Sequence, residues 1–127
     1  MGHNVLVVDD DRVTLEMMDL ILHRIGYEPL IPQSIPEALE IAGKRRPDLI
    51  LLDVQMAPVD GWKFLDALSG RRTGADIPVM LFTARHLLPE EYARYGRRVV
   101  GVLEKPISPL ELKEALDRYF SGAGTGK

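Results

Sequence analysis

Five short apolar runs, separated by segments with helical character, most constrain how this chain can fold. The runs cover residues 5–8, 29–31, 49–52, 79–82 and 99–103. Most of them lack the alternation of apolar and polar residues that a strand shows when one face meets water, as expected for strands buried on both faces of a parallel sheet. The pattern predicts five β-α units folded as a doubly wound α/β sandwich with right-handed crossovers.

The segment 12–25, between the first two runs, is typical of an amphipathic helix. Its expected core face contains Met17, Met18, Ile21 and Ile25. The opposite face contains Glu16, Asp19 and His23. Leu15 and Leu20 fall at the margins of the core face. Gly26 follows as a natural C-terminal stop, so a first helix that ends near this glycine is expected.

Two later helices have clear starts. Ser34 and Ser108 are each followed three residues later by a glutamate, Glu37 and Glu111, and a proline lies in the first turn of both segments. This is the capping-box pattern, in which the Ser hydroxyl and the Glu carboxylate each accept a backbone N–H. The two remaining helices are expected at residues 61–68 and 89–95.

The 127 residues are most simply one domain, long enough for a core but with little room for a second unit. No apolar run approaches the roughly 20 residues needed to span a bilayer, so no membrane contact is expected. A net charge of -3 and scattered basic clusters do not favour nucleic-acid binding. Zero cysteines exclude disulfides, and the N-terminus lacks a signal-peptide pattern, so the cytoplasm is the expected location.

The last seven residues, 121–127, read SGAGTGK and look like a fragment of a phosphate-binding loop. A working loop has a preceding strand, Gly in place of Ser121, and Ser or Thr after the lysine. The sequence has none of these features. Residues 121–127 are therefore expected to be a flexible tail or the start of a linker.

Polar residues follow four of the apolar runs, where ligands bind in an open parallel sheet. They are Asp9, Asp10 and Asp11 after the first run, Asp53 after the third, Thr83 and Ala84 after the fourth, and Glu104, Lys105 and Pro106 after the fifth. Carboxylates that converge at one edge repel each other and need a compensating cation. Hard oxygen ligands, without cysteine or a histidine cluster, favour Mg²⁺ over Zn²⁺.

These residue types suit phosphoryl transfer. Mg²⁺ held by one or two carboxylates commonly meets a phosphoryl group. The Lys105 ammonium can neutralise phosphoryl oxygens, and the Thr83 hydroxyl can donate to one of them. A carboxylate can itself accept phosphate, since aspartyl phosphates are covalent intermediates. The residues alone indicate an Asp-based, Mg²⁺-dependent phosphoryl-transfer site.

Taken singly, each of these residues has a plainer interpretation. Three consecutive aspartates are more often a turn and a helix N-cap than a metal site. Thr83 alone would be a strand-end hydroxyl, and Lys105 alone a solvated charge. Their joint placement at four strand ends favours the site.

Four motifs, VLVVDDD, LILLDVQM, VMLFTA and LEKP, occur in this order along the chain. In that order and at that spacing they resemble the receiver domain of two-component response regulators, from residue 4 to about residue 120. The resemblance implies a flavodoxin-like (βα)5 three-layer sandwich with a parallel five-stranded sheet of order 2-1-3-4-5. It assigns residues 4–120 to the receiver domain and leaves 121–127 as the tail or linker.

The resemblance implies a role for each metal-site residue. Asp53 is the expected phosphoryl acceptor, Asp10 a direct metal ligand, and Asp9 a ligand that acts mainly through metal-bound water. The backbone carbonyl of Gln55 is expected to complete the set around Mg²⁺ or Mn²⁺.

Roles for the remaining site residues follow from the same resemblance. Thr83 is expected to bind and sense the phosphoryl group, helped by the backbone N–H of Ala84. Lys105 is expected to pair with the carboxylate of Asp53 and later with its phosphate. The bond between Lys105 and Pro106 is expected to be cis.

A receiver domain is a signalling phosphoacceptor that catalyses only its own phosphorylation and slow autodephosphorylation. The expected donor is a phosphohistidine on a sensor histidine kinase or a histidine phosphotransfer protein, and the expected target is a downstream output domain or protein. The switch is a population shift, with residues 85–98 as its expected mobile face. Leu15 and Leu20 are the expected docking residues for the partner, and a monomer or phosphorylation-dependent dimer is expected.

The chain departs from the family at two places. Ala57 stands four residues after the acceptor, where the family commonly has proline, and Pro58 follows it. Val102 stands three residues before Lys105, where the family's switch usually has an aromatic. A short β-branched side chain cannot swing in and out as a Tyr or Phe does, although Thr83 can still move.

Two other functions compete with this interpretation. A haloacid-dehalogenase-like phosphatase would use Asp9 as nucleophile, with Asp11 and Val13 completing its first motif, but it leaves Asp53 unexplained. A pure interaction module that keeps the fold and is never phosphorylated is the second alternative. Clustered carboxylates repel each other, and such a module would have no reason to keep them.

Overall fold

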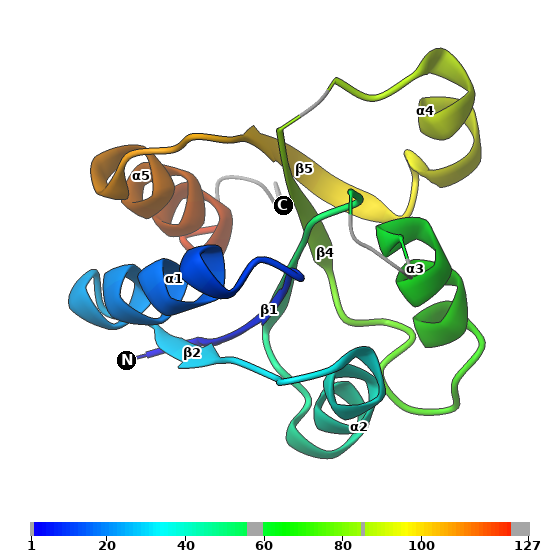
Figure 1. The fold of residues 1–127 in the computed structure, drawn as a ribbon, viewed down its shortest axis with the longest axis horizontal. Helices are drawn as coiled ribbons and strands as arrows, with labels where there is room; N and C mark the ends of the chain where they lie inside the picture. Colours follow the sequence, from blue (N-terminus) through cyan, green and yellow to red (C-terminus); the bar gives the residue numbers. More distant parts are fainter. Residues whose placement is uncertain (1, 56–59, 85, 123–127) are drawn as a thin grey trace.

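A computed structural model gives the structure of residues 2–55, 60–84 and 86–122 (Figure 1). Within them, strands and helices alternate along the chain. The elements are β1 (Asn4–Val8), α1 (Arg12–Arg24), β2 (Glu28–Leu30), α2 (Ile35–Arg45), β3 (Leu49–Leu52), α3 (Gly61–Ser69), β4 (Val79–Thr83), α4 (Pro89–Tyr95), β5 (Val99–Glu104) and α5 (Pro109–Phe120). The five β-α units expected from the apolar runs are confirmed.

The five strands form one parallel sheet in the order β2-β1-β3-β4-β5. Helices α1 and α5 cover one face, and α2, α3 and α4 lie on the other (Figure 1). This three-layer arrangement confirms the expected flavodoxin-like fold. None of the described helices is long and apolar enough to cross a membrane.

Each face of the sheet has its own apolar core, because successive side chains of a strand point to opposite faces. Along β3, Leu49 and Leu51 pack with α1 and α5, while Ile50 and Leu52 pack with α2 and α3. All four residues of β3 are buried. The continuous apolar runs are therefore explained by burial on both faces.

The expected core face of α1 is wrong in part. The buried residues of this helix are Leu15, Met18 and Leu22, whereas Met17 is 51% exposed. Leu15 thus belongs to the core, not to its margin, and Leu20 is 63% exposed. Apolar residues occupy so much of the circumference of this helix that periodicity alone does not select the face that meets the sheet.

The two capping boxes differ in detail. At α5 the box is complete, because the Ser108 hydroxyl accepts the N–H of Glu111 and the Glu111 carboxylate accepts the N–H of Ser108. At α2 the Ser34 hydroxyl accepts the N–H of Glu37, but the Glu37 carboxylate accepts the N–H of Gln33 instead. Both serines therefore begin a helix as expected.

Helix α4 is attached to α3 through aromatic and polar side chains. All seven of its residues are described and none of them is buried. The ring of Tyr95 stacks on the indole of Trp62, with 4.3 Å between the ring centroids. The indole N–H donates to Glu91 at 2.7 Å, and the Tyr95 hydroxyl donates to Asp66 at 3.1 Å. These contacts cross between the two helices, so they hold α4 beside α3.

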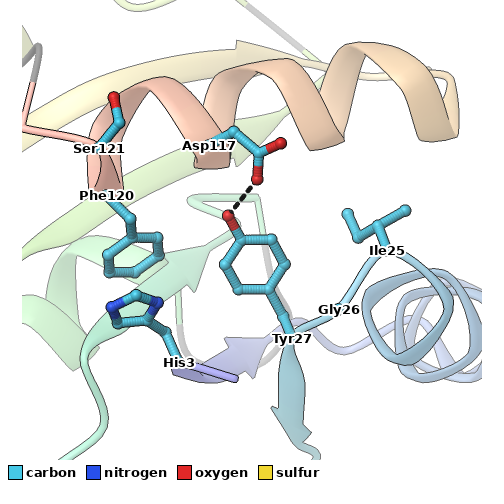
Figure 2. Close-up of a pocket in the computed structure, with 7 residues that line it drawn as sticks. All are labelled: His3, Ile25, Gly26, Tyr27, Asp117, Phe120 and Ser121. Carbon is cyan, nitrogen blue, oxygen red and sulfur yellow. Dashed lines mark hydrogen bonds between the residues drawn. The ribbon is translucent and has the colours of Figure 1, made fainter. Parts of the chain in front are cut away.

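The residues just before β1 and β2 contact helix α5 at the end of the sheet where the strands begin. The ring of His3 stacks on Phe120 with centroids 4.0 Å apart, and the Tyr27 hydroxyl donates to Asp117 at 2.6 Å (Figure 2). Burial, together with the Asp117 carboxylate, raises the pKa of Tyr27 well above its ordinary value. A surface hollow of about 360 Å³ lies beside these rings.

Candidate functional site

The acidic residues come together because their strands are neighbours. Asp9 and Asp10 follow β1, Asp53 follows β3, and the two strands pair in parallel with Val8 opposite Leu52. Carboxylate oxygens of all three aspartates lie within 4.8 Å of one another. The predicted convergence at the carboxyl ends of the strands is therefore present in the structure.

Asp53 is a buried carboxylate, with 5% of its surface exposed. Its N–H donates to the carbonyl of Val8, its Oδ1 accepts the N–H of Gln55 at 3.0 Å, and its Oδ2 lies 3.2 Å from the Lys105 ammonium. Burial raises the pKa of the Asp53 carboxyl, and the nearby Asp9 carboxylate adds to the rise. The hydrogen bond from Gln55 and the charge of Lys105 oppose it without cancelling it.

Gly61 allows the chain to approach Asp53 closely after the loop. A Cβ at this position would lie 2.4 Å from the backbone carbonyl oxygen of Asp53 and 2.6 Å from the Cα of Val54. The Gly61 N–H donates to the Val54 carbonyl at 3.1 Å. A side chain at residue 61 would therefore displace the backbone of Asp53.

Lys105 bridges two carboxylates. Its Nζ lies 2.7 Å from Asp9 Oδ2 and 3.2 Å from Asp53 Oδ2, with 19% of the lysine side chain exposed. Burial by itself lowers the pKa of Lys105, but the hydrogen bonds and charges of the two aspartates outweigh it and raise the pKa. The ammonium is therefore held charged between them. The bond from Lys105 to Pro106 is cis, as expected.

Asp9 differs from Asp10 in its surroundings. The Asp9 side chain is only 1% exposed, and its Oδ1 accepts the backbone N–H of Asp11 at 2.9 Å while its Oδ2 binds Lys105. Asp10 is exposed to solvent. The N–H of Asp11 is a partner of Asp9 that the motif did not indicate.

Thr83 and Ala84 lie where expected, at the end of β4. Thr83 is fully buried and pairs in register with Glu104, and its carbonyl accepts the Lys105 N–H at 2.9 Å. Ala84 follows it and is exposed. Both Thr83 and Glu104 belong to their strands, so the strands are one residue longer than the apolar runs.

Phe82 is a neighbour of the site that sequence reasoning missed. Its ring lies beneath the Lys105 ammonium, with 5.1 Å from Nζ to the ring centroid. The available signal was an aromatic residue directly before Thr83, but an apolar strand residue is normally assigned to the core alone.

Val102 occupies β5 opposite Leu81 and packs, partly buried, against the core on the α2 and α3 face. The position of the usual aromatic is therefore filled by a small side chain. The other departure, at Ala57 and Pro58, and the neighbouring position Arg85 lie outside the described residues.

The donor set suits a hard divalent cation. The three carboxylates of Asp9, Asp10 and Asp53 offer oxygen ligands within a few ångströms of one another. Oxygen ligands of this kind are those that Mg²⁺ prefers, and Mg²⁺ is usually held by one or two carboxylates with the remaining positions open to water and phosphate. The residues present therefore fit Mg²⁺.

Comparison with protein families gives one match that covers most of the chain. The model of the response regulator receiver domain matches residues 5–117. Response regulator MprA of Mycobacterium sp. (strain KMS) is 37% identical over 108 residues, which are 85% of this chain and 46% of that protein. MprA of Mycobacterium tuberculosis (strain ATCC 25618 / H37Rv) is 36% identical over 112 residues, 88% of this chain and 48% of the relative. The chain thus spans about half the length of these relatives.

Solved structures give the same result. The N-terminal domain of a response regulator receiver protein from Methanoculleus marisnigri JR1 has a TM-score of 0.76 and 37% identity, covering 91% of this chain and 94% of that one. Chemotaxis protein CheY4 of Vibrio cholerae has a TM-score of 0.81 and 30% identity, with 93% and 98% covered. The receiver domain of sensor histidine kinase PA1611 from Pseudomonas aeruginosa PAO1, crystallised with magnesium in its active site cleft, shares the fold at 24% identity, a TM-score of 0.80, and coverage of 95% and 99%.

Proposed function

This chain belongs to the response regulator receiver domain family, and we propose that Asp53 accepts a phosphoryl group from a phosphohistidine on a partner protein in a Mg²⁺-dependent reaction. As a receiver, it is a signalling domain of two-component systems and not a classical enzyme. The observation that carries the proposal is the buried Asp53 carboxylate, 3.2 Å from Lys105 and grouped with two further aspartates.

The chemistry is a displacement at phosphorus. An oxygen of Asp53 attacks the phosphorus in line with the N–P bond of the donor. The O–P bond forms, the N–P bond breaks, its electron pair stays on the imidazole nitrogen, and the imidazole takes up a proton. The transition state is loose, so positioning and charge neutralisation matter more than acid or base catalysis.

Two kinds of contact would neutralise the negative charge of the phosphoryl group: a metal ion held by the carboxylates, and the ammonium of Lys105. Asp9, Asp10, Asp53 and the backbone carbonyl of Gln55 would hold Mg²⁺ or Mn²⁺. When bound, this ion neutralises phosphoryl oxygens. Before phosphorylation the Lys105 ammonium pairs with the carboxylates of Asp9 and Asp53, and after it the ammonium pairs with the phosphoryl group on Asp53.

Two groups at the carboxyl end of β4 contact the product. The Thr83 hydroxyl and the backbone N–H of Ala84 donate to phosphoryl oxygens. Because these contacts exist only with the phosphoryl group bound, they shift the population toward the active conformation.

The switch is proposed to act through the segment of residues 85–98. Support comes from α4, which contributes no buried residue and is held by side chains at its surface. Segments with few buried contacts open at low free-energy cost. Relaxation-dispersion NMR with and without beryllofluoride, a phosphoryl mimic, tests this; spectra unchanged across the segment would overturn it.

Partner docking is proposed on the exposed apolar face of α1. Leu15, one of the two residues expected to dock the partner, is buried and is left out of this surface. Three residues spaced by four and three along the helix, Val13, Met17 and Leu20, are 65%, 51% and 63% exposed. They form the α1 stripe. The helix begins directly after Asp11, beside the phosphoryl site, so a helix of a histidine kinase or phosphotransfer protein seated on the stripe would bring its phosphohistidine to Asp53.

The remaining expectations are proposals supported by family membership. The phosphoryl donor is a sensor histidine kinase or a histidine phosphotransfer protein, and an output domain or protein receives the signal. The cytoplasm is the proposed location. The protein is proposed to be a monomer or to dimerise on phosphorylation.

Mass spectrometry after incubation with acetyl phosphate and Mg²⁺ tests the proposed function. The expected result is one phosphoryl adduct on Asp53, absent without Mg²⁺ and absent in Asp53→Asn. An adduct on Asp9 would instead support the haloacid-dehalogenase-like phosphatase. Failure of Asp53 to label from acetyl phosphate or from a phosphohistidine donor would support the interaction module that is never phosphorylated.

A further inference from the structure

Among the residues that the structure describes, the Lys105 ammonium contacts two carboxylates and one uncharged aromatic ring. The carboxylates are those of Asp9 and Asp53, at 2.7 and 3.2 Å. The ring is that of Phe82, whose centroid lies 5.1 Å from Nζ. Phe82 is 5% exposed and pairs with Leu103 on β5, two residues before the lysine. The strand register therefore fixes the ring beneath the ammonium.

We propose that Phe82 is a positioning residue for phosphoryl transfer: its ring keeps the Lys105 ammonium beside Asp53 while the Asp9 carboxylate changes partner. The inference rests on the proposed function, because it concerns the reaction at Asp53. Phe82 does not touch the phosphoryl group. It acts only through the lysine.

The need for such a residue follows from the double use of Asp9. The Asp9 carboxylate is closer to the Lys105 ammonium than Asp53 is. It is also one of the three carboxylates that fit Mg²⁺. When Asp9 turns toward a cation, its ion pair with Lys105 weakens. The ammonium then loses its shortest contact at the point in the reaction where it has to meet the phosphoryl oxygens.

A bound cation would not draw the Phe82 ring away from Lys105 as it draws the Asp9 carboxylate. The face of an aromatic ring is its negative side and attracts an ammonium, but it does not ligate Mg²⁺. In a partly desolvated site such an attraction changes an equilibrium by a factor of roughly 2 to 30. With 19% of its side chain exposed, Lys105 is partly desolvated. The ring is therefore a constant partner while the carboxylates exchange theirs.

The alternative is that Phe82 serves only the core. It packs in the cluster formed by α1, α5 and the sheet. Phe64 is a matched control, because its ring is 1% exposed and packs in the core on the opposite face of the sheet. Phe64→Leu and Phe82→Leu each remove one buried ring, and of the two rings it is Phe82 that lies beneath the ammonium.

The experiment measures the rate of phosphorylation of Asp53 by acetyl phosphate at saturating Mg²⁺. Phe82→Leu is expected to lower the rate constant by about threefold to tenfold, while Phe64→Leu stays within about twofold of the wild type. Phenylalanines carrying one, two and three fluorine atoms at position 82 keep the ring nearly the same size and weaken its negative face. The rate constant is expected to fall stepwise along this series.

A second readout does not depend on phosphorylation. NMR of the Lys105 side chain in the presence of Mg²⁺ is expected to show an ordered ammonium in the wild type and in Phe64→Leu, and a mobile one in Phe82→Leu. Equal rates and equal lysine mobility in the two leucine variants, or a flat fluorination series, would overturn the proposal. A wild-type protein that never labels on Asp53 would refute the proposed function instead, and the lysine mobility would still decide whether the ring holds the ammonium.

Discussion

The indole of Trp62 lies flat on the ring of Tyr95, with the two planes 7° from parallel, and this stack fixes α4 to α3. The Tyr95 hydroxyl donates to Asp66 at 3.1 Å, and burial together with the Asp66 carboxylate raises the pKa of Tyr95. Val102 leaves β5 without the usual aromatic. Among the described residues, the aromatic contact between α3 and α4 therefore helps to hold α4, together with the two hydrogen bonds between these helices.

Removing this contact is expected to loosen α4. Tyr95→Ala should lower the free energy of unfolding by about 1 kcal/mol beyond the loss of buried area, since stacked pairs contribute about 0.5–1.5 kcal/mol. Hydrogen exchange in α4 should accelerate, and the fluorescence of Trp62, the single tryptophan, should change. Tyr92→Ala is the control, because Tyr92 lies on the same helix and is 53% exposed. Equal effects of the two variants would contradict the assignment.

Neutralising Asp53 is expected to stabilise the fold at neutral pH. Burial raises the pKa of Asp53 above its ordinary 3.8, so the folded protein binds this proton more tightly than the unfolded chain. The contribution of Asp53 is therefore most favourable at low pH and is lost as the pH rises through the pKa of the folded state. Asp53→Asn should raise the free energy of unfolding at pH 7 by about 1.4 kcal/mol for each pKa unit of the rise.

Urea unfolding without Mg²⁺, from pH 3 to pH 8, measures this gain. The gain should disappear as the pH falls below the ordinary pKa of the carboxyl. Asp19→Asn, at an exposed position of α1, should show no such gain. A less stable Asp53→Asn at pH 7 would mean that the ion pair with Lys105 outweighs burial.

Mg²⁺ is expected to stabilise the protein through the three grouped carboxylates. At a concentration about 100 times its dissociation constant, a ligand that binds only the folded state adds about 2.7 kcal/mol. Asp10→Asn should remove most of the rise in melting temperature on adding Mg²⁺. Asp11→Asn is the matched control, because Asp11 is the adjacent acid outside the group and begins α1 as its N-cap. A full Mg²⁺ response in Asp10→Asn would contradict its role as a ligand.

Gly61 is expected to tolerate no side chain. Gly61→Ala would place a methyl group 2.4 Å from a backbone oxygen of Asp53, and relieving this overlap should cost about 1–3 kcal/mol. Thermal unfolding measures the loss. At Gly70, the C-cap residue after α3, the nearest atom to an added Cβ is 3.7 Å away, so Gly70→Ala should be close to neutral. An equally mild effect at both glycines would show that the backbone near Asp53 adjusts freely.

The α1 stripe is expected to govern the encounter with the phosphoryl donor. Met17→Asp should slow transfer from a phosphorylated histidine kinase or phosphotransfer protein by about tenfold or more, while labelling by acetyl phosphate stays normal. Tyr92→Asp changes a side chain of similar exposure on α4, on the other face of the sheet, and should leave donor transfer unchanged. Unaltered transfer to Met17→Asp would remove α1 from the docking surface.

The strands were predictable because each central run is buried on both faces, so apolar character alone marks it. Their exact ends were not, since Thr83 and Glu104 are polar residues that still pair in register. The face of α1 was predicted only in part: Met18 is in the core as expected, but burial of Leu15 and Leu22 depends on how the helix sits on the sheet. Its periodicity fits Met17 equally well.

The same division holds for the site. Its residues could be found from the sequence, because parallel strands bring their carboxyl ends to one edge. The distances could not, and so the closer pairing of Lys105 with Asp9 than with Asp53 emerges only from the side-chain positions. Phe82 was hidden for the same reason.

The contacts of His3 with Phe120 and of Tyr27 with Asp117 join the residues before β1 and β2 to α5, at the end of the sheet opposite Asp53 (Figure 2). The start of β1 and the end of α5 are therefore close in space. A short added segment that joins them would make the chain circular without changing the strand order. The domain is thus suited to circular permutation, with new ends opened in an exposed loop. Asp53 would keep its surroundings, because the junction lies a full strand length away.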